Sequence, residues 1–361
     1  MTALTLAPMS ELKKRMKNRV LLFCLFFFFA GKIFSQPAEN ESTVLFYNVE
    51  NLFDLIDNPK TNDDEFTPKG DRRWTYKRLF KKLQDISKVI LNAAGWTPPD
   101  LVALCEIENR YVLERLISDT PLKSFPYKII HKESPDSRGI DVALLYNADT
   151  FYPVEYRYIP IRLENDSLLN TREILYVSGI LKNADTLHIF ANHWPSRYSG
   201  LLESQSFRNR AATLLRTEIE SLQGNDSNPN IIIVGDFNDQ PSDESITHYL
   251  GAKEYSENNL NGSENQIINL SHSWMQQELG TLKFQSQWSV FDQIMVSGNL
   301  LNTENKLFTS PDQAKIVQLP FLLDRDERYG GLKTNRTYNG FRYQGGFSDH
   351  LPVLIKLQVS P

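Results

Sequence analysis

The chain has 361 residues, of which 41% are hydrophobic and 23% are charged, and its formal net charge is −5. A chain of this length buries a core large enough to need no disulfide staples. The acidic balance argues against a protein that binds nucleic acid through a broad basic face, without excluding one that uses local arginines.

Residues 1–35 have the pattern of a secretory signal peptide. The basic segment Lys13–Arg19 precedes the apolar segment Val20–Ala30, and Ser35 offers a small residue for cleavage. Residues 1–35 carry six basic residues and one acidic residue, so residues 36–361 have a formal net charge of −10. We therefore expect an exported protein, periplasmic or extracellular, with 36–361 as its single domain. An uncleaved membrane anchor is the alternative.

Exported proteins often contain disulfides, but residues 36–361 of this chain cannot form an intramolecular one. Cys24 lies in the segment that is expected to be removed, which leaves Cys105 alone. Cys105 falls within an apolar run, so we expect a buried strand residue and no disulfide.

Along the rest of the chain, six apolar segments indicate buried strands, and each carries acids, amides or imidazoles at or near one end. In chain order, these segments are Val44–Asp54 with Asn48 and Glu50, Pro99–Glu106 with Glu106, Ile189–Arg197 with His193, Ile231–Asn238 with Asp236 and Asn238, Trp288–Ser297 with Asp292, and Gly345–Val353 with Asp349 and His350. Because side chains two apart on a strand share a face, Asn48 and Glu50 are expected to point the same way.

Helical periodicity occurs between these strands, over Tyr76–Asn92, Asn109–Ser118 and Glu203–Leu222. The basic residues Lys77 to Lys82 are interpreted as the solvent face of the first helix. Two long insertions, Tyr255–Gln287 and Asn299–Gly345, separate the late polar motifs. The second mixes basic and aromatic residues, which suits either nucleotide or lipid-headgroup binding, or a plain surface loop. The alternation of strands and helices predicts an α/β fold with two sheets flanked by helices.

Each polar side chain also has a structural explanation. Asn48 can close a turn, Glu106 can cap a helix, and Asp236 can belong to a loop. Six such strand ends together favour one convergent site for a metal ion and a phosphate group. Carboxylate and amide oxygens suit hard divalent cations, and His193 and His350 titrate near neutral pH.

The ordered motifs Asn-x-Glu, Leu-Cys-Glu, Asn-His-Trp-Pro, Gly-Asp-Phe-Asn, Trp-x-x-x-Asp and Ser-Asp-His resemble the endonuclease/exonuclease/phosphatase superfamily, which has the deoxyribonuclease-I-like fold. The resemblance runs from about Val44 to about Leu357. It implies a four-layer sandwich of two mainly antiparallel sheets flanked by helices. It also implies hydrolysis of phosphoric esters with Mg²⁺, with Mn²⁺ or Ca²⁺ as alternatives.

The resemblance assigns roles to residues. The implied metal residues are Asn48, Glu50, Glu106 and Asp349. Among the implied catalytic residues, Asp236 orients or activates water and Asn238 contacts the scissile phosphate. His350 stabilises the phosphoryl oxygens while Asp292 holds its imidazole, and His193 is a candidate acid for the leaving oxygen.

Arg138, Arg172 and Arg197 lie in or beside loops near these motifs. Guanidinium groups bind phosphate bidentately, so all three are candidate substrate clamps, with Arg197 favoured because it follows His193. The alternative for each is a solvated side chain or a structural ion pair. Asp141 is interpreted as structural.

We therefore expect an exported, Mg²⁺-dependent phosphodiesterase, endonuclease-like on nucleic acid and monomeric, with no stable protein partner. The alternatives are an enzyme for phospholipids or sugar phosphates and a catalytically silent surface-binding protein. The acidic chain favours the first alternative somewhat. The silent protein is disfavoured because every expected catalytic position carries suitable chemistry.

Overall fold

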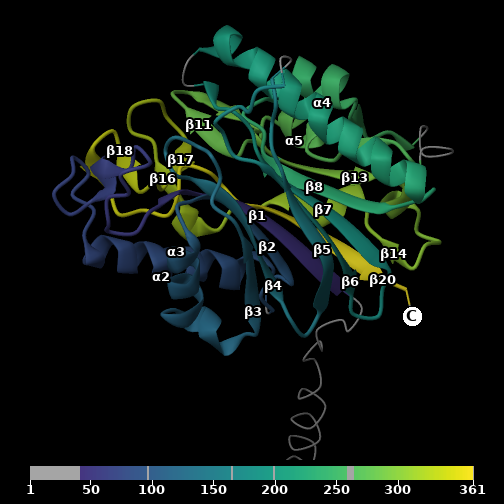
Figure 1. Ribbon diagram of the computed structural model, residues 1–361, viewed down its shortest axis with the longest axis horizontal. Helices are drawn as coiled ribbons and strands as arrows, with labels where there is room; N and C mark the ends of the chain where they lie inside the picture. The colour runs from purple at the N-terminus through teal and green to yellow at the C-terminus, as the bar shows by residue number, and fades with distance from the viewer. Residues whose placement is uncertain (1–40, 96, 164–165, 198–199, 258–263, 361) are drawn as a thin grey trace, which may run out of the picture. The chain divides into compact units, whose positions relative to one another are not determined.

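Two β-sheets face each other across an apolar core in the computed structural model, and helices cover their outer faces (Figure 1). The structure describes residues 41–95, 97–163, 166–197, 200–257 and 264–360. The expected signal segment, residues 1–35, lies outside these. Among the residues described, no helix is both long and apolar enough to cross a membrane.

The first sheet places the first and last strands of the described chain side by side. Its strand order is β14 (Leu307–Phe308), β20 (Val353–Val359), β1 (Glu41–Leu52), β2 (Leu101–Ile107), β4 (Asp141–Asn147) and β3 (Tyr127–His131), and β15 (Ala314–Ile316) also pairs with β20. Strand β1 runs parallel to β2 and antiparallel to β20. Cys105 is buried in β2 as a free thiol, as the sequence predicts.

The second sheet brings polar strand ends into register. Its order is β5 (Phe151–Ile159), β6 (Ile174–Leu181), β7 (Thr186–His193), β8 (Asn230–Asp236), β13 (Asp292–Ser297), β10 (Ile267–Asn269) and β9 (Lys253–Glu254). Asp236 lies opposite His193 on the parallel strand β7 and opposite Asp292 on the antiparallel strand β13. Paired residues point to the same face, so this register gathers the side chains.

The predicted helices are confirmed as α2 (Tyr76–Ala93), α3 (Arg110–Ser118) and α4 (Leu201–Asn225), with a short α5 (His272–Gln276). Asn109 caps α3, its side chain accepting a hydrogen bond from Val112 N at 3.1 Å. Apolar residues of α2 and α3 join the core of the first sheet, whereas those of α4 pack on the outer face of the second. The expected four-layer sandwich is confirmed (Figure 1).

The described parts of the expected insertions form three short hairpins, in addition to β10, β14 and β15 of the main sheets and the helix α5. The hairpins are β11 (Leu282–Phe284) with β12 (Gln287–Ser289), β16 (Leu323–Arg325) with β17 (Leu332–Thr334), and β18 (Tyr338–Asn339) with β19 (Arg342–Tyr343). Single helical turns occupy Asp64–Phe66, Pro121–Ser124, Ser245–Leu250, Gly298–Leu301, Pro311–Gln313 and Pro320–Leu322.

Lys82 departs from the expectation of a solvent-facing basic helix. Its side chain is 2% exposed, and its Nζ donates to Thr337 Oγ1 at 2.5 Å and to the carbonyl of Phe347 at 2.6 Å. The helical phase explains this, because Lys82 follows Leu79 by three residues and shares its buried face. Lys82 therefore ties α2 to the segment that leads to His350.

Arg208 of α4 is the buried support of the loop after β8. Its Nε lies 2.8 Å from Asp239 Oδ1, and neither side chain reaches solvent appreciably. R208L leaves the buried Asp239 with the partly exposed Arg197 as its remaining cation, so it is expected to lower the unfolding free energy by about 3 kcal/mol in urea denaturation.

The matched control is R216L on the same helix, whose exposed pair with Glu220 is expected to contribute less than about 0.5 kcal/mol. Equal losses in the two variants would contradict the importance of the buried pair.

Candidate active site

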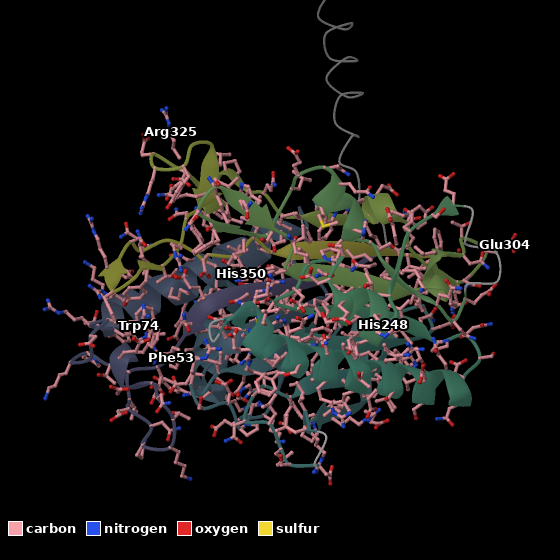
Figure 2. The ribbon with its side chains drawn as sticks, turned by 90° about the horizontal axis from the view of Figure 1, so that it is seen from above. Phe53, Trp74, His248, Glu304, Arg325 and His350 are labelled. Atoms are coloured by element: carbon pink, nitrogen blue, oxygen red, sulfur yellow. The ribbon has the colours of Figure 1, made fainter. Side chains whose placement is uncertain are left out.

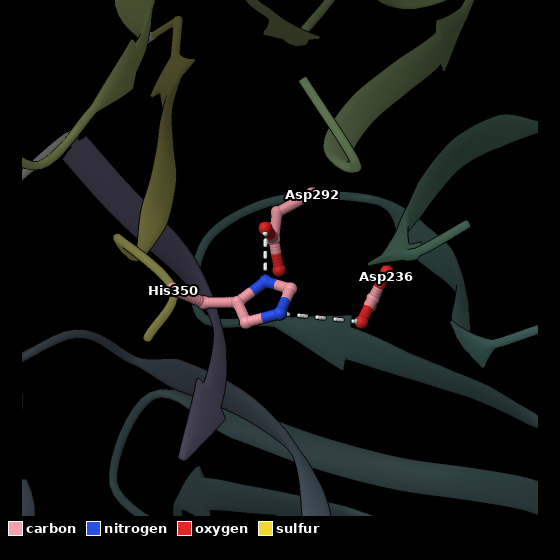
Figure 3. Close-up of side chains that lie close together, drawn as sticks. All are labelled: Asp236, Asp292 and His350. Atoms are coloured by element: carbon pink, nitrogen blue, oxygen red, sulfur yellow. Dashed lines mark hydrogen bonds and ion pairs between the residues drawn. The ribbon is translucent and has the colours of Figure 1, made fainter. Parts of the chain in front are cut away.

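Asp236 is the point at which the polar strand ends converge (Figure 3). Its side chain is 2% exposed, and Oδ2 accepts a hydrogen bond from Asn48 Nδ2 at 3.0 Å. Its other oxygen accepts from the backbone N–H of Asn238 at 3.0 Å. The Nε2 atoms of His193 and His350 lie 3.7 Å and 3.8 Å away. Both sheets therefore contribute to one carboxylate.

His350 reaches this point from the segment before β20. Its Nδ1 lies 2.7 Å from Asp292 Oδ2 in a buried acid–imidazole pair (Figure 3). Ser348 fixes the backbone here, because its hydroxyl donates to the carbonyl of Asn48 at 2.7 Å and accepts from the N–H of His350 at 3.0 Å. The imidazole is thereby locked in direction.

Glu106 stands beside Asn48 at the end of β2. Asn48 Nδ2 lies 3.4 Å from one Glu106 oxygen, and the N–H of Asn51 donates to the other at 3.0 Å. Glu106 has a φ of 62°, at an irregularity in the pairing of β2 with β4. Non-glycine residues in this left-handed conformation cost energy and cluster at functional sites.

The two histidines differ in protonation. Burial alone would lower the pKa of His350, but the carboxylates of Asp292 and Asp236 outweigh it and hold the pKa well above its usual value. Burial, together with the nearby Arg172 and Arg138, lowers the pKa of His193 well below its usual value. Near pH 7, His350 is therefore cationic and His193 neutral.

Asp236 has the pKa of a near-neutral base. Burial raises its pKa to about 6, although the nearby His350 imidazole opposes the shift. A carboxyl group with such a pKa changes protonation near physiological pH, which suits proton transfer.

The donor set fits a hard divalent cation. Ligand atoms of Asp236, Asp292 and His350 lie within 4.8 Å of one another. Two buried atoms, Asp292 Oδ1 and His193 Nδ1, have no hydrogen-bond partner among the residues described. Glu106 adds a carboxylate beside this group, whereas the Asn48 amide presents its nitrogen to Glu106 and Asp236 and its oxygen to the N–H of Glu50.

Glu50 and Asp349 do not point into this group. Glu50 accepts hydrogen bonds from the N–H groups of Thr337 at 2.6 Å and Tyr338 at 3.1 Å, and Asp349 pairs with Arg336 at 2.8 Å. The expectation that Asn48 and Glu50 share a face is wrong. The pairing of β1 with β2 shifts after Asn48 and Glu50 has a φ of 52°, which interrupts the two-residue alternation.

Two of the candidate arginines have structural partners. Arg172 is buried between Asp136 Oδ2 at 2.8 Å and the carbonyl of Trp194 at 2.6 Å. Arg197 pairs with Asp239 at 2.7 Å and with Asp243 at 2.5 Å, although it follows His193 closely in sequence.

Arg138 differs from these two, because 44% of its side chain is exposed and its Nε lies 3.7 Å from the Oδ1 of its acidic neighbour Asp136. Asp141 is structural as expected, with His131 Nε2 at 2.8 Å.

Sequence reasoning missed Arg336 and the residues that hold Glu50. The Arg336 guanidinium lies 3.6 Å from Glu50 and bonds Asp349, the residue directly before His350 in sequence. The only available signal was the mixture of basic and aromatic residues in the second insertion.

A family model described as "Endonuclease/Exonuclease/phosphatase family" matches residues 43–359. The chain belongs to this family. The resemblance inferred from the strand-end motifs is thereby confirmed, and members of the family are metal-dependent phosphoester hydrolases. Comparison with curated proteins finds no match.

Solved structures confirm the family fold. The human Nocturnin catalytic domain with bound sulfate is 14% identical, with 89% of this chain and 95% of that one covered and a TM-score of 0.51. Humanised D. rerio TDP2 is 13% identical, with 88% and 98% covered and a TM-score of 0.53. A Bacteroides thetaiotaomicron mannosyl-6-phosphatase is 16% identical, with 88% and 99% covered and a TM-score of 0.53.

The acid–imidazole pair predicts an unusual titration. In protein with ¹⁵N-labelled histidine, the His350 signals should remain those of imidazolium through pH 7, while His193 stays neutral. Asp292→Asn removes the negative charge that favours the imidazolium, so it should lower the pKa of His350 by one unit or more, on the order of a single close charge.

Asp141→Asn is the control, because Asp141 holds His131 and not His350. A His350 signal that titrates near 6.5 in both the parent and Asp292→Asn would show that Asp292 does not set its charge.

Proposed function

We propose that this protein is a divalent-metal-dependent phosphodiesterase that acts on nucleic acid. One observation carries the proposal, the buried Asp236 with a cationic and a neutral imidazole on either side and Asn48 and Glu106 beside it. This arrangement supplies a base, a cationic donor and a metal ligand within one site.

Glu106 is the residue that would hold Mg²⁺, and Asn48 lies beside its carboxylate, with Nδ2 at 3.4 Å. His350 is a poorer ligand, because its Nδ1 is occupied by Asp292 and its raised pKa keeps a proton on the ring. Glu106 keeps part of its side chain accessible, unlike Asp292. A bound divalent ion at Glu106 would neutralise negative charge that accumulates on the phosphoryl oxygens. Mn²⁺ and Ca²⁺ present the same preference for oxygen ligands.

The chain's own residues divide the proton chemistry. Asp236, fixed by Asn48 and by the N–H of Asn238, accepts a proton from the attacking water. The His350 imidazolium, held by Asp292, donates to a phosphoryl oxygen and balances its charge. His193 is neutral, and in the tautomer that carries the proton on Nε2 its N–H donates a hydrogen bond to the leaving oxygen, which takes its proton from solvent.

The Asn238 amide has another partner, since its Nδ2 donates to the carbonyl of Trp194 at 3.1 Å. Its role in the proposal is therefore to hold the loop after β8 against the His193 segment. The backbone N–H of the same residue orients Asp236.

An enzyme for phospholipids or sugar phosphates is the second candidate. The structural neighbour named as a mannosyl-6-phosphatase favours it, as does the negative net charge of the chain.

The exposed guanidinium of Arg138 favours a substrate with more than one phosphate, because it offers a cation to a phosphate beside the reacting one. A silent binding protein would not need the costly burial of Asp236 and Asp292.

The location and assembly of the enzyme are also proposals. The signal-peptide pattern of residues 1–35 supports export to the periplasm or the extracellular space. We propose a monomer without a stable protein partner, because the sequence motifs and the site are complete within one chain.

Activity is tested with supercoiled plasmid, a single-stranded oligonucleotide and bis-aryl phosphate in the presence of Mg²⁺. Glu106→Ala and His350→Ala are each expected to lower kcat at least about a hundredfold, because each removes a group that acts on the reacting phosphate. Glu114→Ala and His248→Ala are matched controls on α3 and on the turn Ser245–Leu250, and they should retain parental rates.

Loss of activity in the controls as well would point to misfolding. Cleavage of sphingomyelin or a sugar phosphate, but of neither plasmid nor the single-stranded oligonucleotide, would transfer the proposal to the second candidate.

Metal dependence is tested by isothermal titration with Mg²⁺ and by EDTA treatment. EDTA should abolish hydrolysis, and added Mg²⁺ should restore it. Glu106→Gln should weaken Mg²⁺ binding at least about tenfold, because it exchanges a charged ligand for a neutral one of the same shape. Unchanged Mg²⁺ affinity in Glu106→Gln would place the ion elsewhere.

A further inference from the structure

A cleft of about 680 Å³ opens next to the candidate active site. Asn51 and Arg172 line it. The N–H of Asn51 bonds Glu106, and Arg172 bonds the carbonyl of Trp194, directly after His193. The cleft therefore starts at the residues that surround the reacting phosphate in the proposed function. A group attached to that phosphate would extend into it.

An exposed aromatic ring forms part of the cleft wall. Phe341 lies at the turn between β18 and β19, and 62% of it is exposed. The turn is held in place by Arg72, whose Nη1 donates to the carbonyl of Gly340 at 3.0 Å and whose guanidinium lies 5.4 Å from the Phe341 ring centroid. The exposed ring therefore presents a flat apolar face on which a planar group of a ligand can stack.

The support of Phe341 is rigid. The Arg72 guanidinium also lies 4.8 Å from the Phe66 ring and 5.1 Å from the Tyr338 ring, and its Nε lies 2.8 Å from Glu65. Phe66 in turn stacks on Phe53, which lines the cleft and is labelled in Figure 2. Because these contacts hold the turn in place, Phe341 loses little conformational entropy when a flat group stacks on its ring.

Arg138 adds a positive charge to the wall of the cleft. Arg138 lines the same cleft with an exposed side chain, and its neighbour Asp136 already pairs with Arg172 at 2.8 Å. The cleft thus combines a planar apolar surface with an available guanidinium, beside a site for phosphate. A nucleotide carries the matching groups, a flat base and a neighbouring phosphate.

We propose that this cleft binds single-stranded nucleic acid, with one base stacked on Phe341 and an adjacent phosphate on Arg138. The inference rests on the proposed function and names its substrate class. Stacking requires an unpaired base, whereas tight binding of a duplex relies on many phosphate contacts from a basic surface. The net charge of −5 disfavours such a surface.

The test compares a fluorescent single-stranded 12-mer with an abasic 12-mer that has the same phosphates and no bases. The DNA and RNA forms of the 12-mer are assayed separately. The parent should cleave the base-bearing strand with a kcat/KM about tenfold above that for the abasic strand, as expected for one stacked base. Phe341→Ala should abolish this difference and Phe341→Trp should keep it. Phe284→Ala, an exposed aromatic residue outside the cleft, is the control and should also keep it.

Equal cleavage of both strands by the parent would overturn the base-stacking inference while leaving the phosphodiesterase in place. Loss of binding to phosphatidylserine vesicles in Phe341→Ala, with oligonucleotide cleavage unchanged, would overturn it in favour of a lipid surface. Cleavage of bis-aryl phosphate that depends on Glu106, without cleavage of any oligonucleotide, would overturn both the inference and the nuclease form of the proposed function.

Discussion

Asp236 is a carboxylate removed from water, and the groups that compensate for its burial come from both sheets. Asn48 on β1 donates to it, while His193 on β7 and His350 before β20 stand on either side of it. Burying an isolated carboxylate is costly, so this arrangement is stable only when the two sheets meet at one register. The same requirement that orders the sandwich assembles the site. Stability and chemistry are therefore linked at a single residue.

The surroundings of Asp236 also give two histidines different protonation states. His350 faces the carboxylates of Asp292 and Asp236, whereas His193 is buried near Arg172. Two imidazoles less than 4 Å from one carboxylate thus carry different charges at one pH. Environments that push pKa values apart are how a site assigns acid and base roles. Arg172, which pairs with Asp136 at 2.8 Å, contributes to this difference through its positive charge near His193.

The strand-end residues were predictable because a polar side chain at the end of an apolar run is a strong local signal. Asp236, Asp292 and Glu106 were found in this way. Glu50 was misplaced because the irregular pairing after Asn48 overrides alternation, and no local pattern announces a bulge.

Arg172 and Arg197 were expected to clamp the substrate, but both have acidic partners in the fold, whereas Arg138 stays exposed. Arg197 depends on acids about forty residues away in the chain, and such pairings appear only after folding. The role of Phe341 likewise depends on Arg72, which lies far from it in sequence.

The position of β20 near the end of the chain determines when the site can be completed during folding. It pairs with β1 on one side and with β14 and β15 on the other, and His350 directly precedes it. A nascent chain still lacking residues 348–359 has β1 with an open edge and Asp236 without one of its imidazoles. Pairings between such distant segments form late, since closing the intervening loop is entropically expensive. The site around Asp236 is therefore incomplete until β20 has paired with β1.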